Sequence, residues 1–366
     1  MNAIPRLALV LLATLLGHSR PAAPPATTEP RPVRVFILAG QSNMEGPAVV
    51  DLSGKDYNQG KGTLRSLLED PRTRPLVEPL VDRDADHDAD HHGTTPIAWR
   101  VRDDVRVWYK PERGAVRSGP LTVGFTPHGG THHFGPEIQF GMVVGDAIDG
   151  PVLLIKTAWG GKSLHTDFRP PSSGRDTGKY YKLMLENIAL ALADLRASDE
   201  PSKDPAYEIA GLVWYQGWND GCDPEHAVPE YEQNLVNLIK DLRTDLGVAN
   251  LPVVVAELTG PWKEAPGAWD TLRKAQAAAA ARPEFKGNVV FVPTHDFVRA
   301  PEDSPNPGHG HHEFGNAETY LLVGDAMGRA MLGLIGLGEK TTPNPTPTPG
   351  TTSTSPTEPT AKPKRE

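Results

Sequence analysis

The sequence has a single cysteine, Cys222, among its 366 residues. One thiol excludes an intramolecular disulfide, so the core alone has to stabilise the fold. We interpret Cys222 as a loop or packing residue and not as a nucleophile. Long apolar runs are also missing, because no stretch approaches the ~20 residues of a membrane-spanning helix. Acidic and basic residues are interspersed with a formal net charge of −9, which excludes the basic stripe of a nucleic-acid-binding protein.

The two ends of the chain differ in composition from its middle. Residues 1–23 carry Arg6, an apolar run at 7–16 and small residues at the end, a pattern typical of a signal peptide. We therefore expect a secreted or periplasmic protein. A buried first helix is the alternative, and the proline-rich stretch that follows disfavours it. Residues 24–32 and 339–366 are rich in Pro, Thr and charged residues, which predicts a disordered linker and a disordered tail.

Between these ends, apolar runs alternate with stretches of helical periodicity. The apolar runs predict buried strands at Val33 to Ala39, Val152 to Thr157, Ile209 to Tyr215, Val253 to Leu258 and Val289 to Val292. Helices are expected near 136–147, 179–196, 227–246, 267–282 and 316–335. Nearly all-apolar strands separated by helices predict an α/β fold, a three-layer α/β/α sandwich with a mostly parallel sheet. We expect one domain over residues 33–338.

Residues 50–135 interrupt this alternation. They contain an Asp- and His-rich stretch from Asp82 to His92, followed by two apolar runs at 105–109 and 121–123. These runs predict a short antiparallel pair of strands. We interpret the segment as a β-containing insertion that lines the site, not as a second domain. In parallel sheets ligands bind beyond the carboxyl ends of the strands, and so the chemistry is expected in the loops at that edge.

A serine stands directly after the first expected strand, in Gly40-Gln41-Ser42-Asn43-Met44. A hydroxyl is a poor nucleophile at neutral pH and needs a general base within hydrogen-bonding distance, together with donors for the developing oxyanion. A serine after a strand is also a common cap or turn residue. The assignment of Ser42 as a nucleophile therefore depends on partners elsewhere in the sequence.

Two further strand ends offer oxyanion donors. Gly160 and Gly161 follow the strand at 152–157, and Asn219 follows the strand at 209–215. A glycine can present its backbone N–H without a side chain in the way, and an asparagine amide can donate hydrogen bonds. Together with the N–H of Ser42 they predict an oxyanion hole of three donors. Turn formation is the alternative role of these residues.

Histidines gather after the last expected strand and before the final helix, at His309, His311 and His312. One of them is the expected general base. A metal site is the alternative, because imidazoles are common zinc ligands and three further histidines lie between residues 87 and 92. The spacing of these histidines matches no known zinc signature, and so we expect no metal ligands among them.

In this order the segments resemble a known family. The blocks G-Q-S-N-M, W-G-G-K-S-L and W-Y-Q-G-W-N-D and the late histidine are similar to the sialate O-acetylesterase and acetylxylan esterase branch of the SGNH hydrolases. The segment Phe134-Gly135-Pro136-Glu137 resembles a further part of that branch. The resemblance spans residues 33–335, and its first block is the most specific. It implies a flavodoxin-like sheet and a serine esterase that removes O-acetyl groups from a carbohydrate without a cofactor.

The resemblance also implies a role for each matching residue. Ser42 corresponds to the nucleophile, and Gly161, or its neighbour Gly160, to the backbone oxyanion donor. Asn219 corresponds to the side-chain oxyanion donor. His312 is the preferred base, because its spacing to the following helix resembles the family's better than that of the two neighbouring histidines.

The acid that orients the histidine departs from the family pattern. The family usually places an acid three residues before its histidine, where this sequence has His309. Some members instead have a glutamate at the position of Trp218. Asp296, directly beyond the last expected strand, is the first candidate for this acid, with Asp303 and Asp220 behind it.

Two other functions remain open at this stage. The departure at the acid fits a catalytically silent carbohydrate-binding protein on the same fold, and the histidine clusters fit a metal-dependent hydrolase. An acetylated carbohydrate is the expected partner in the preferred interpretation, and nucleic acid is not. The sequence distinguishes neither the acetylated glycan nor the oligomeric state.

Overall fold

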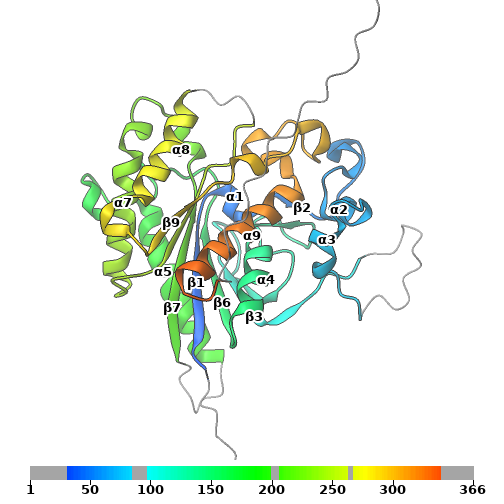
Figure 1. Ribbon diagram of the computed structural model, residues 1–366, viewed down its shortest axis with the longest axis horizontal. Helices are drawn as coiled ribbons and strands as arrows, with labels where there is room; N and C mark the ends of the chain where they lie inside the picture. Colours follow the sequence, from blue (N-terminus) through cyan, green and yellow to red (C-terminus); the bar gives the residue numbers. More distant parts are fainter. Residues whose placement is uncertain (1–30, 85–96, 199–205, 263–266, 339–366) are drawn as a thin grey trace, which may run out of the picture. The chain divides into compact units, whose positions relative to one another are not determined.

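The computed structural model describes residues 31–84, 97–198, 206–262 and 267–338 (Figure 1). The expected signal peptide, most of the linker, the tail and the histidines between residues 87 and 92 lie outside the described residues. The described residues from Pro32 onward belong to one compact unit. They include Ser42, Gly160, Gly161, Asn219, Asp296 and His312.

A seven-stranded sheet forms the middle layer, in the order β4-β3-β6-β1-β7-β8-β9. Its strands are β1 (Val33–Gly40), β3 (Arg102–Tyr109), β4 (Arg117–Leu121), β6 (Val152–Ala158), β7 (Tyr207–Tyr215), β8 (Val253–Ala256) and β9 (Val289–Val292). All neighbours pair in parallel except β4, which runs antiparallel to β3 at the edge. Parallel strands are covered on both faces, which explains why their sequences are nearly all apolar.

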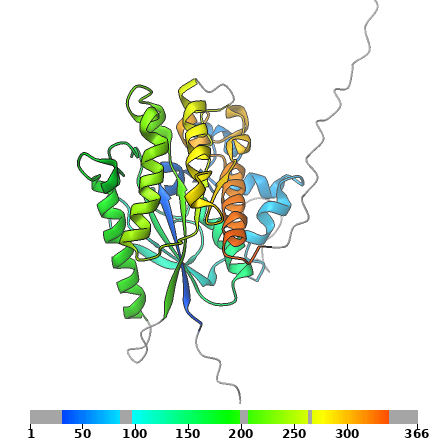
Figure 2. The ribbon, with the colours of Figure 1, turned by 60° about the vertical axis from the view of Figure 1, so that its left-hand side comes forward.

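Helices cover both faces of this sheet (Figures 1 and 2). One face packs against α5 (Lys179–Ser198), α7 (Ala227–Asp245) and α8 (Gly267–Ala280), and the other against α4 (Glu137–Ala147) and α9 (Ala317–Leu334).

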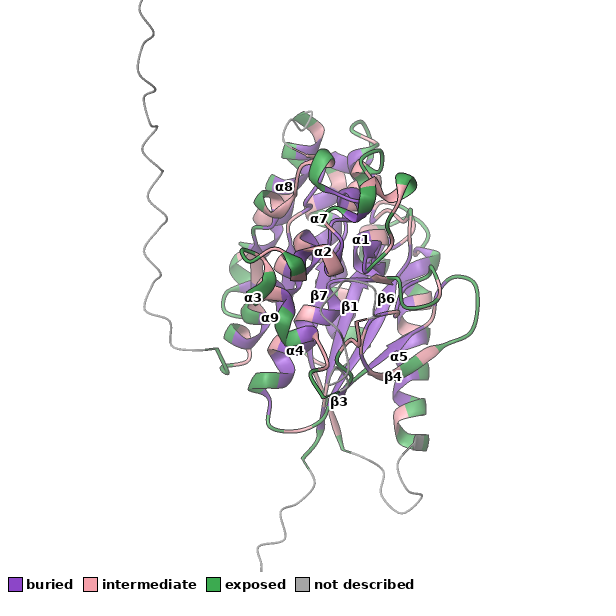
Figure 3. Cartoon of the chain, turned by 90° about the vertical axis from the view of Figure 1, so that its right-hand side faces the viewer, coloured by how far each residue is buried: buried purple, intermediate pink, exposed green. Residues whose placement is uncertain are grey.

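The central strand β1 contributes to both cores. Val35 and Ile37 join the cluster on the α5 side, while Phe36 and Leu38 join the cluster on the α9 side. These side chains are fully buried, and burial of each contributes about 1.5–3 kcal/mol. Figure 3 shows buried residues filling the strands and the helix sides that face them.

The structure confirms the expected fold class. Each of the five strands and five helices expected from the sequence is present, with ends that differ by at most a few residues. The result is an α/β fold with three layers and a mostly parallel sheet. Within the described ranges, no helix has both the length and the apolarity to cross a bilayer.

The segment 50–135 differs in part from its expected form. β3 and β4 form the expected antiparallel pair, but the second strand ends at Leu121 instead of beginning there. β3 also pairs in parallel with β6, so it belongs to the main sheet and does not stand apart from it. An antiparallel pair joins the main sheet here because Val105 and Val107 are apolar and fully buried.

The remaining elements are short. They are α1 (Ser42–Glu45), β2 (Ala48–Val49), η1 (Lys55–Gly60), α2 (Leu64–Glu69), α3 (Arg74–Val77), η2 (Glu78–Leu80), β5 (His133–Phe134), η3 (Pro171–Ser173), α6 (Trp218–Gly221), η4 (Pro283–Phe285), η5 (His295–Phe297), η6 (Pro301–Asp303) and η7 (Gly310–Gly315). Strands β2 and β5 pair antiparallel in a small second sheet. Five of these elements, α1, α6, η5, η6 and η7, carry candidate site residues.

Candidate active site

The ends of three neighbouring strands meet beside Ser42. β1 lies between β6 and β7, and so the loops that follow these strands share one edge of the sheet. The Trp159 N–H donates to the Gly40 carbonyl at 3.3 Å, and the Gln41 N–H donates to the Tyr215 carbonyl at 3.4 Å. A Cβ at position 40 would lie 2.1 Å from the Tyr215 carbonyl oxygen, so this close approach requires glycine.

A hollow of about 370 Å³ opens at this edge. Its lining residues are Gln41, Ser42, Glu45, Pro47, Pro127, His128, Gly160, Gly161, Trp218, Asn219, His311 and His312. The structure thus brings Ser42, Gly161, Asn219 and His312 together around one space, although they come from four separate segments. Pro127 and His128 belong to the 50–135 segment, which therefore forms part of the wall.

The side chain of Gln41 orients Asn219. Nε2 of Gln41 donates to Oδ1 of Asn219 at 3.1 Å, while Oε1 of Gln41 accepts from the backbone N–H groups of Gly217 at 3.1 Å and Asn219 at 3.4 Å. Because Oδ1 is occupied, Nδ2 of Asn219 is fixed on the other side, where it donates to the Gly161 carbonyl at 3.1 Å. An amide nitrogen carries two hydrogens, so one remains for a ligand.

The two glycines after β6 differ in the use of their N–H groups. The Gly160 N–H faces the buried carboxyl of Glu45, which accepts a hydrogen bond from the Tyr109 hydroxyl at 2.6 Å. Burial raises the pKa of Glu45. Within the described part of the chain, the Gly161 N–H makes no hydrogen bond, and its φ of 71° is one that glycine favours. Gly161 is therefore the better placed of the two as an oxyanion donor.

Asp220 joins the loop after β7 to the loop after β6. Its fully buried carboxyl accepts from the backbone N–H groups of Leu164 and His165, each at 2.8 Å, and from Nε2 of Gln216 at 2.6 Å. Burial raises the pKa of Asp220 to about 6. Both carboxyl oxygens are occupied in this way, so Asp220 holds the loops together and does not orient His312.

The segment Phe134-Gly135-Pro136-Glu137, which also resembles the family, supports the same region through Glu137. Glu137 forms a fully buried ion pair with Lys156 of β6, with Oε2 and Nζ 2.8 Å apart. The same ammonium donates to the carbonyls of Glu45 at 2.8 Å and Phe125 at 2.7 Å. Lys156 thus ties the end of α1 to the chain that leads to Pro127 at the rim.

His312 lies in the wall of the hollow, half-buried in η7. Burial, and secondly the neighbouring imidazoles of His311, His309 and His128, lower the pKa of His312 to about 4. The ring is therefore neutral at pH 7, which is the form that a general base requires. His311 also lines the hollow, with its ring centroid 4.1 Å from that of His312, whereas His309 is exposed outside it.

The structure does not bring Asp296 to His312. In the described residues, no carboxylate lies within hydrogen-bonding distance of the His312 ring, and Asp296 does not line the hollow. Asp296 follows β9, which is three strand positions from β1, and adjacent strands lie ~4.8 Å apart. The loop beyond β9 therefore begins too far from β1 along this edge of the sheet. The orienting role expected for Asp296 has no geometric support.

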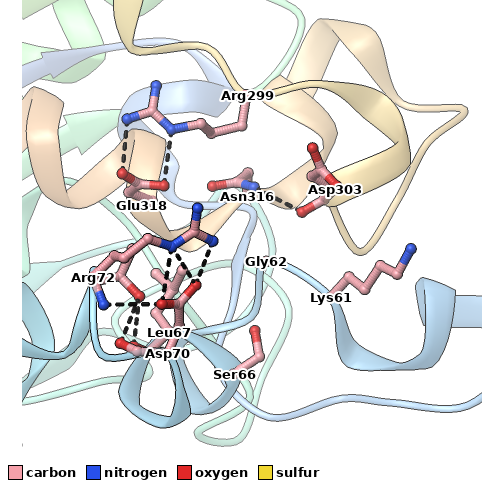
Figure 4. A pocket seen from close by; sticks show the side chains of 11 residues that line it. Lys61, Gly62, Ser66, Leu67, Asp70, Arg72, Arg299, Asp303, Asn316 and Glu318 are labelled. Atoms are coloured by element: carbon pink, nitrogen blue, oxygen red, sulfur yellow. Dashed lines mark hydrogen bonds and ion pairs between the residues drawn. The ribbon is translucent and has the colours of Figure 1, made fainter.

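Asp303 lines a second, larger hollow of about 650 Å³ between α2 and the start of α9 (Figure 4). Two ion pairs face this space. Nη2 of Arg72 lies 2.6 Å from Oδ2 of Asp70, and Nη2 of Arg299 lies 2.8 Å from Oε1 of Glu318. The lining includes a serine but no histidine, so it offers no imidazole base for nucleophilic catalysis. The smaller hollow at Ser42 is therefore the candidate active site.

The metal alternative finds no ligand set in the described ranges. Within them, no group of three or more His, Cys, Asp or Glu side chains is arranged to hold a metal ion. Cys222 is exposed and does not line the hollow. The histidines between residues 87 and 92 lie outside the described residues.

Three residues with a part in the site were not singled out from the sequence. Gln41 directly precedes the serine in the first block and Glu45 directly follows that block, but their roles depend on Asn219 and Gly160, which follow different strands. His128 reaches the rim from a loop that has no motif of its own. Only the position of Gln41 inside the G-Q-S-N-M block was a signal that could have drawn attention to it.

Known proteins resemble this chain over most of its length. A family model described as carbohydrate esterase, sialic acid-specific acetylesterase, matches residues 32–331. A probable carbohydrate esterase of Arabidopsis thaliana is 38% identical over 78 residues, which make up 21% of this chain and 28% of that protein. The aligned part therefore spans less than a third of that curated relative.

Solved structures with lower identity cover more of the chain. A protein of Arabidopsis thaliana has a TM-score of 0.49 and 19% identity, covering 82% of this chain and 98% of that one. A carbohydrate acetylesterase from Xanthomonas citri has a TM-score of 0.48 and 16% identity, covering 83% of this chain and 56% of that one. Because the family model matches most of the chain, the protein belongs to the sialic acid-specific acetylesterase family of carbohydrate esterases, which are carboxylic ester hydrolases.

Proposed function

We propose that this protein is a secreted serine esterase that releases acetate from an O-acetylated carbohydrate. One observation carries the proposal: Ser42, Gly161, Asn219 and His312 line the same hollow at the carboxyl edge of the sheet. This set supplies a nucleophile, a base that is neutral at pH 7 and three oxyanion donors, which together suffice for acyl transfer.

The first half of the reaction forms an acetyl-enzyme. The Ser42 oxygen attacks the acetyl carbonyl carbon while His312 takes the hydroxyl proton. The N–H groups of Ser42 and Gly161 and the Asn219 amide hold the negative oxygen. When the tetrahedral intermediate collapses, the bond to the sugar oxygen breaks, and that oxygen takes the proton back from His312.

The second half returns the enzyme to its starting state. A water molecule attacks the acetyl carbonyl carbon and gives its proton to His312. The bond to the Ser42 oxygen then breaks, the proton passes from His312 to that oxygen, and acetic acid leaves and ionises to acetate. No cofactor enters either half, and no carboxylate is assigned behind His312.

The position of Trp218 supports the proposal that a carbohydrate is the alcohol part of the ester substrate. It is half-buried, lines the hollow and has its ring centroid 4.8 Å from that of Trp269. Trp108, Trp159 and Trp214 are fully buried in the core, so they offer no surface to a ligand. An aromatic face held at the rim of an active site is suited to stack on a sugar ring.

The substrate class and the location rest on different grounds. The family description and the name of the Xanthomonas citri protein refer to acetylesterases of carbohydrates, and this chain is proposed to act on the same kind of bond. The proposal of secretion rests on the composition of residues 1–23 alone. Acetylated xylan and O-acetylated sialic acid are both candidate substrates.

The test is hydrolysis of an aryl acetate, of acetylated xylan and of O-acetylated sialic acid by the wild-type protein and two serine variants. Ser42→Ala is expected to abolish acetate release, and Ser66→Ala, in the second hollow, is the matched control that keeps it. A fluorophosphonate should label the wild type and Ser66→Ala but not Ser42→Ala. Labelling of Ser42→Ala at the wild-type rate contradicts the assignment.

The same experiment separates the two alternatives. A carbohydrate-binding protein without activity binds the glycans but neither releases acetate nor reacts with the fluorophosphonate. A metal-dependent hydrolase loses its activity with a chelator and regains it with zinc, whereas the serine mechanism is insensitive to both.

A further inference from the structure

We propose that Asn43, Glu313 and Tyr320 form a buried clamp that aligns Ser42 with His312 through the backbone. This inference deepens the proposed function and rests on it. The three side chains are positioning residues, because none of them touches the hollow in which the substrate would lie. The clamp takes the place of a carboxylate bonded to the imidazole ring.

The first link joins the residues that directly follow the nucleophile and the base. Nδ2 of Asn43 donates to Oε1 of Glu313 at 2.8 Å. Asn43 follows Ser42 and Glu313 follows His312 in the chain, and both side chains are buried. A change in the distance between these two backbones would therefore break a buried hydrogen bond and leave a buried polar group unpaired, which is unfavourable.

The second link is the Tyr320 hydroxyl, which comes from α9. It donates to Oδ1 of Asn43 at 2.8 Å and lies 3.1 Å from the carbonyl oxygen of His312. A hydroxyl has one proton, so these two acceptors share it. Tyr320 is fully buried on a helix whose first turn is capped by the Asn316 side chain, and this gives the clamp a rigid base.

The backbone at Glu313 indicates that this arrangement is held against strain. Glu313 has a φ of 49° and Phe314 a φ of 56°, a left-handed conformation that is unfavourable for residues other than glycine. Oε1 of Glu313 also accepts from the Gly260 N–H at 3.1 Å. The Glu313 side chain thus has two donors on one oxygen, which fixes the turn that directly follows His312.

The need for such a clamp follows from the surroundings of the His312 ring. With no carboxylate bonded to the ring in the described residues, its position depends on packing and on the path of its backbone. Misplacing a reacting group by about 1 Å can cost about 10²-fold in rate. The backbone of His312 must therefore be fixed relative to Ser42 by other contacts, and the clamp supplies them.

The test compares Asn43→Ala, Glu313→Ala, Glu313→Gln and Tyr320→Phe with two matched controls. Asn187→Ala removes another buried asparagine, on α5, and Tyr181→Phe removes another buried hydroxyl, which donates to Asp245 at 2.6 Å. Turnover and KM on an aryl acetate are measured well below the Tm of each variant. Wild-type acetate release that depends on Ser42 must come first, because its absence contradicts the proposed function and not the clamp.

Asn43→Ala and Glu313→Ala are expected to lower kcat by about 10- to 100-fold with KM changed less than about twofold, because alignment is lost and binding is not. Glu313→Gln keeps an acceptor oxygen in the same place and should restore kcat to within about threefold of the wild type. Tyr320→Phe, the most conservative change, should lower kcat by about threefold to tenfold. The controls should change the Tm but not kcat.

A different pattern of kcat values among the variants contradicts the proposed clamp. If Tyr320→Phe and Glu313→Ala are folded and keep the wild-type kcat, the three residues only stabilise the fold. The clamp is equally contradicted if Glu313→Gln is as impaired as Glu313→Ala, because the acceptor oxygen would then not be what matters. Should Glu313→Ala fail to fold, Tyr320→Phe and Asn43→Ala decide the matter.

Discussion

Nε2 of Gln41 donates a hydrogen bond to Oδ1 of Asn219 across 3.1 Å, and this contact fixes which side of the amide faces the active site. The residue beside the nucleophile thus sets the direction of an oxyanion donor that comes from another strand end. Four predictions follow from relationships of this kind.

The first prediction concerns Gln41 and Asn219. Asn219→Ala should lower kcat by about 10²–10³-fold, because one donor to the oxyanion is lost. Gln41→Ala should lower it by about tenfold, because the donor is present but no longer oriented. The combination should be no worse than Asn219→Ala alone, since Gln41 acts through Asn219. Steady-state kinetics of the three variants on an aryl acetate check this, and additive losses would contradict the orienting role.

The second prediction concerns the pH dependence of kcat/KM. Burial and the neighbouring histidines lower the pKa of His312 to about 4. The base is active when neutral, so activity should fall only as the pH drops through this value and not near the usual pKa of ~6.5. A pH profile between 3.5 and 8, with recovery at pH 7 as a control for acid unfolding, tests this. A fall centred at or above pH 6.5 is incompatible with the site as described.

The third prediction concerns stability and Glu313. Burial raises the pKa of this carboxyl to about 8, against 4.5 ordinarily. The folded protein binds the Glu313 proton more tightly than the unfolded chain does. The stabilising effect of this protonation is therefore complete below pH 4.5 and is lost as the pH rises through about 8. Glutamine does not titrate, so Glu313→Gln removes this loss of stability. Relative to the wild type, the variant should gain at least about 1 kcal/mol of unfolding free energy between pH 5 and pH 9.

Denaturant unfolding of both proteins at the two pH values measures this difference. The groups that face Glu313 are the side chains of Asn43 and Arg273, the N–H of Gly260 and the hydroxyls of Tyr215 and Tyr320. They are the same in both proteins, so their contributions cancel to first order. An equal pH dependence of wild type and variant would mean that Glu313 is ionised throughout.

The fourth prediction concerns Trp218 as the surface that contacts the sugar. Trp218→Ala should raise KM on an acetylated carbohydrate by about tenfold, because a stacking contact of about 1 kcal/mol or more is lost. KM on a small aryl acetate should change less than about twofold. The matched control is Trp269→Phe, which changes the ring behind Trp218 but keeps an aromatic support. An equal loss on both substrates would mean that Trp218 shapes the acyl site instead.

The sequence was sufficient for the elements that depend on local pattern. β1, β6 and β7 are nearly all apolar because both faces of the sheet are covered, and this pattern is visible without knowledge of partners. Because ligands bind beyond the carboxyl ends of parallel strands, Ser42, Gly161 and Asn219 were expected at one edge of the sheet, and the structure has them there. Their convergence needed only the order of strands and helices along the chain.

Pairings between distant segments could not be predicted in this way. β3 was expected in a short antiparallel pair, but its pairing with β6 was not predicted, because nothing in its own sequence indicates that pairing. Asp296 was chosen because it directly follows a strand, but the position of that strand in the sheet decides the distance to His312, and the sequence does not give it. Nothing in the sequence indicated that Glu313 contacts Asn43, because the two residues lie in segments far apart along the chain.

The ammonium of Lys156 has a consequence for how this active site can diversify. It holds the carbonyls of Glu45 and Phe125 at once, so the helix that carries the nucleophile and the stretch that leads to Pro127 and His128 share one anchor. A loop insertion near residue 125 would take one of its three acceptors from this buried ammonium, which is unfavourable. Relatives with other substrate preferences should therefore vary in the side chains at positions 127 and 128, while the path of the chain before them is kept.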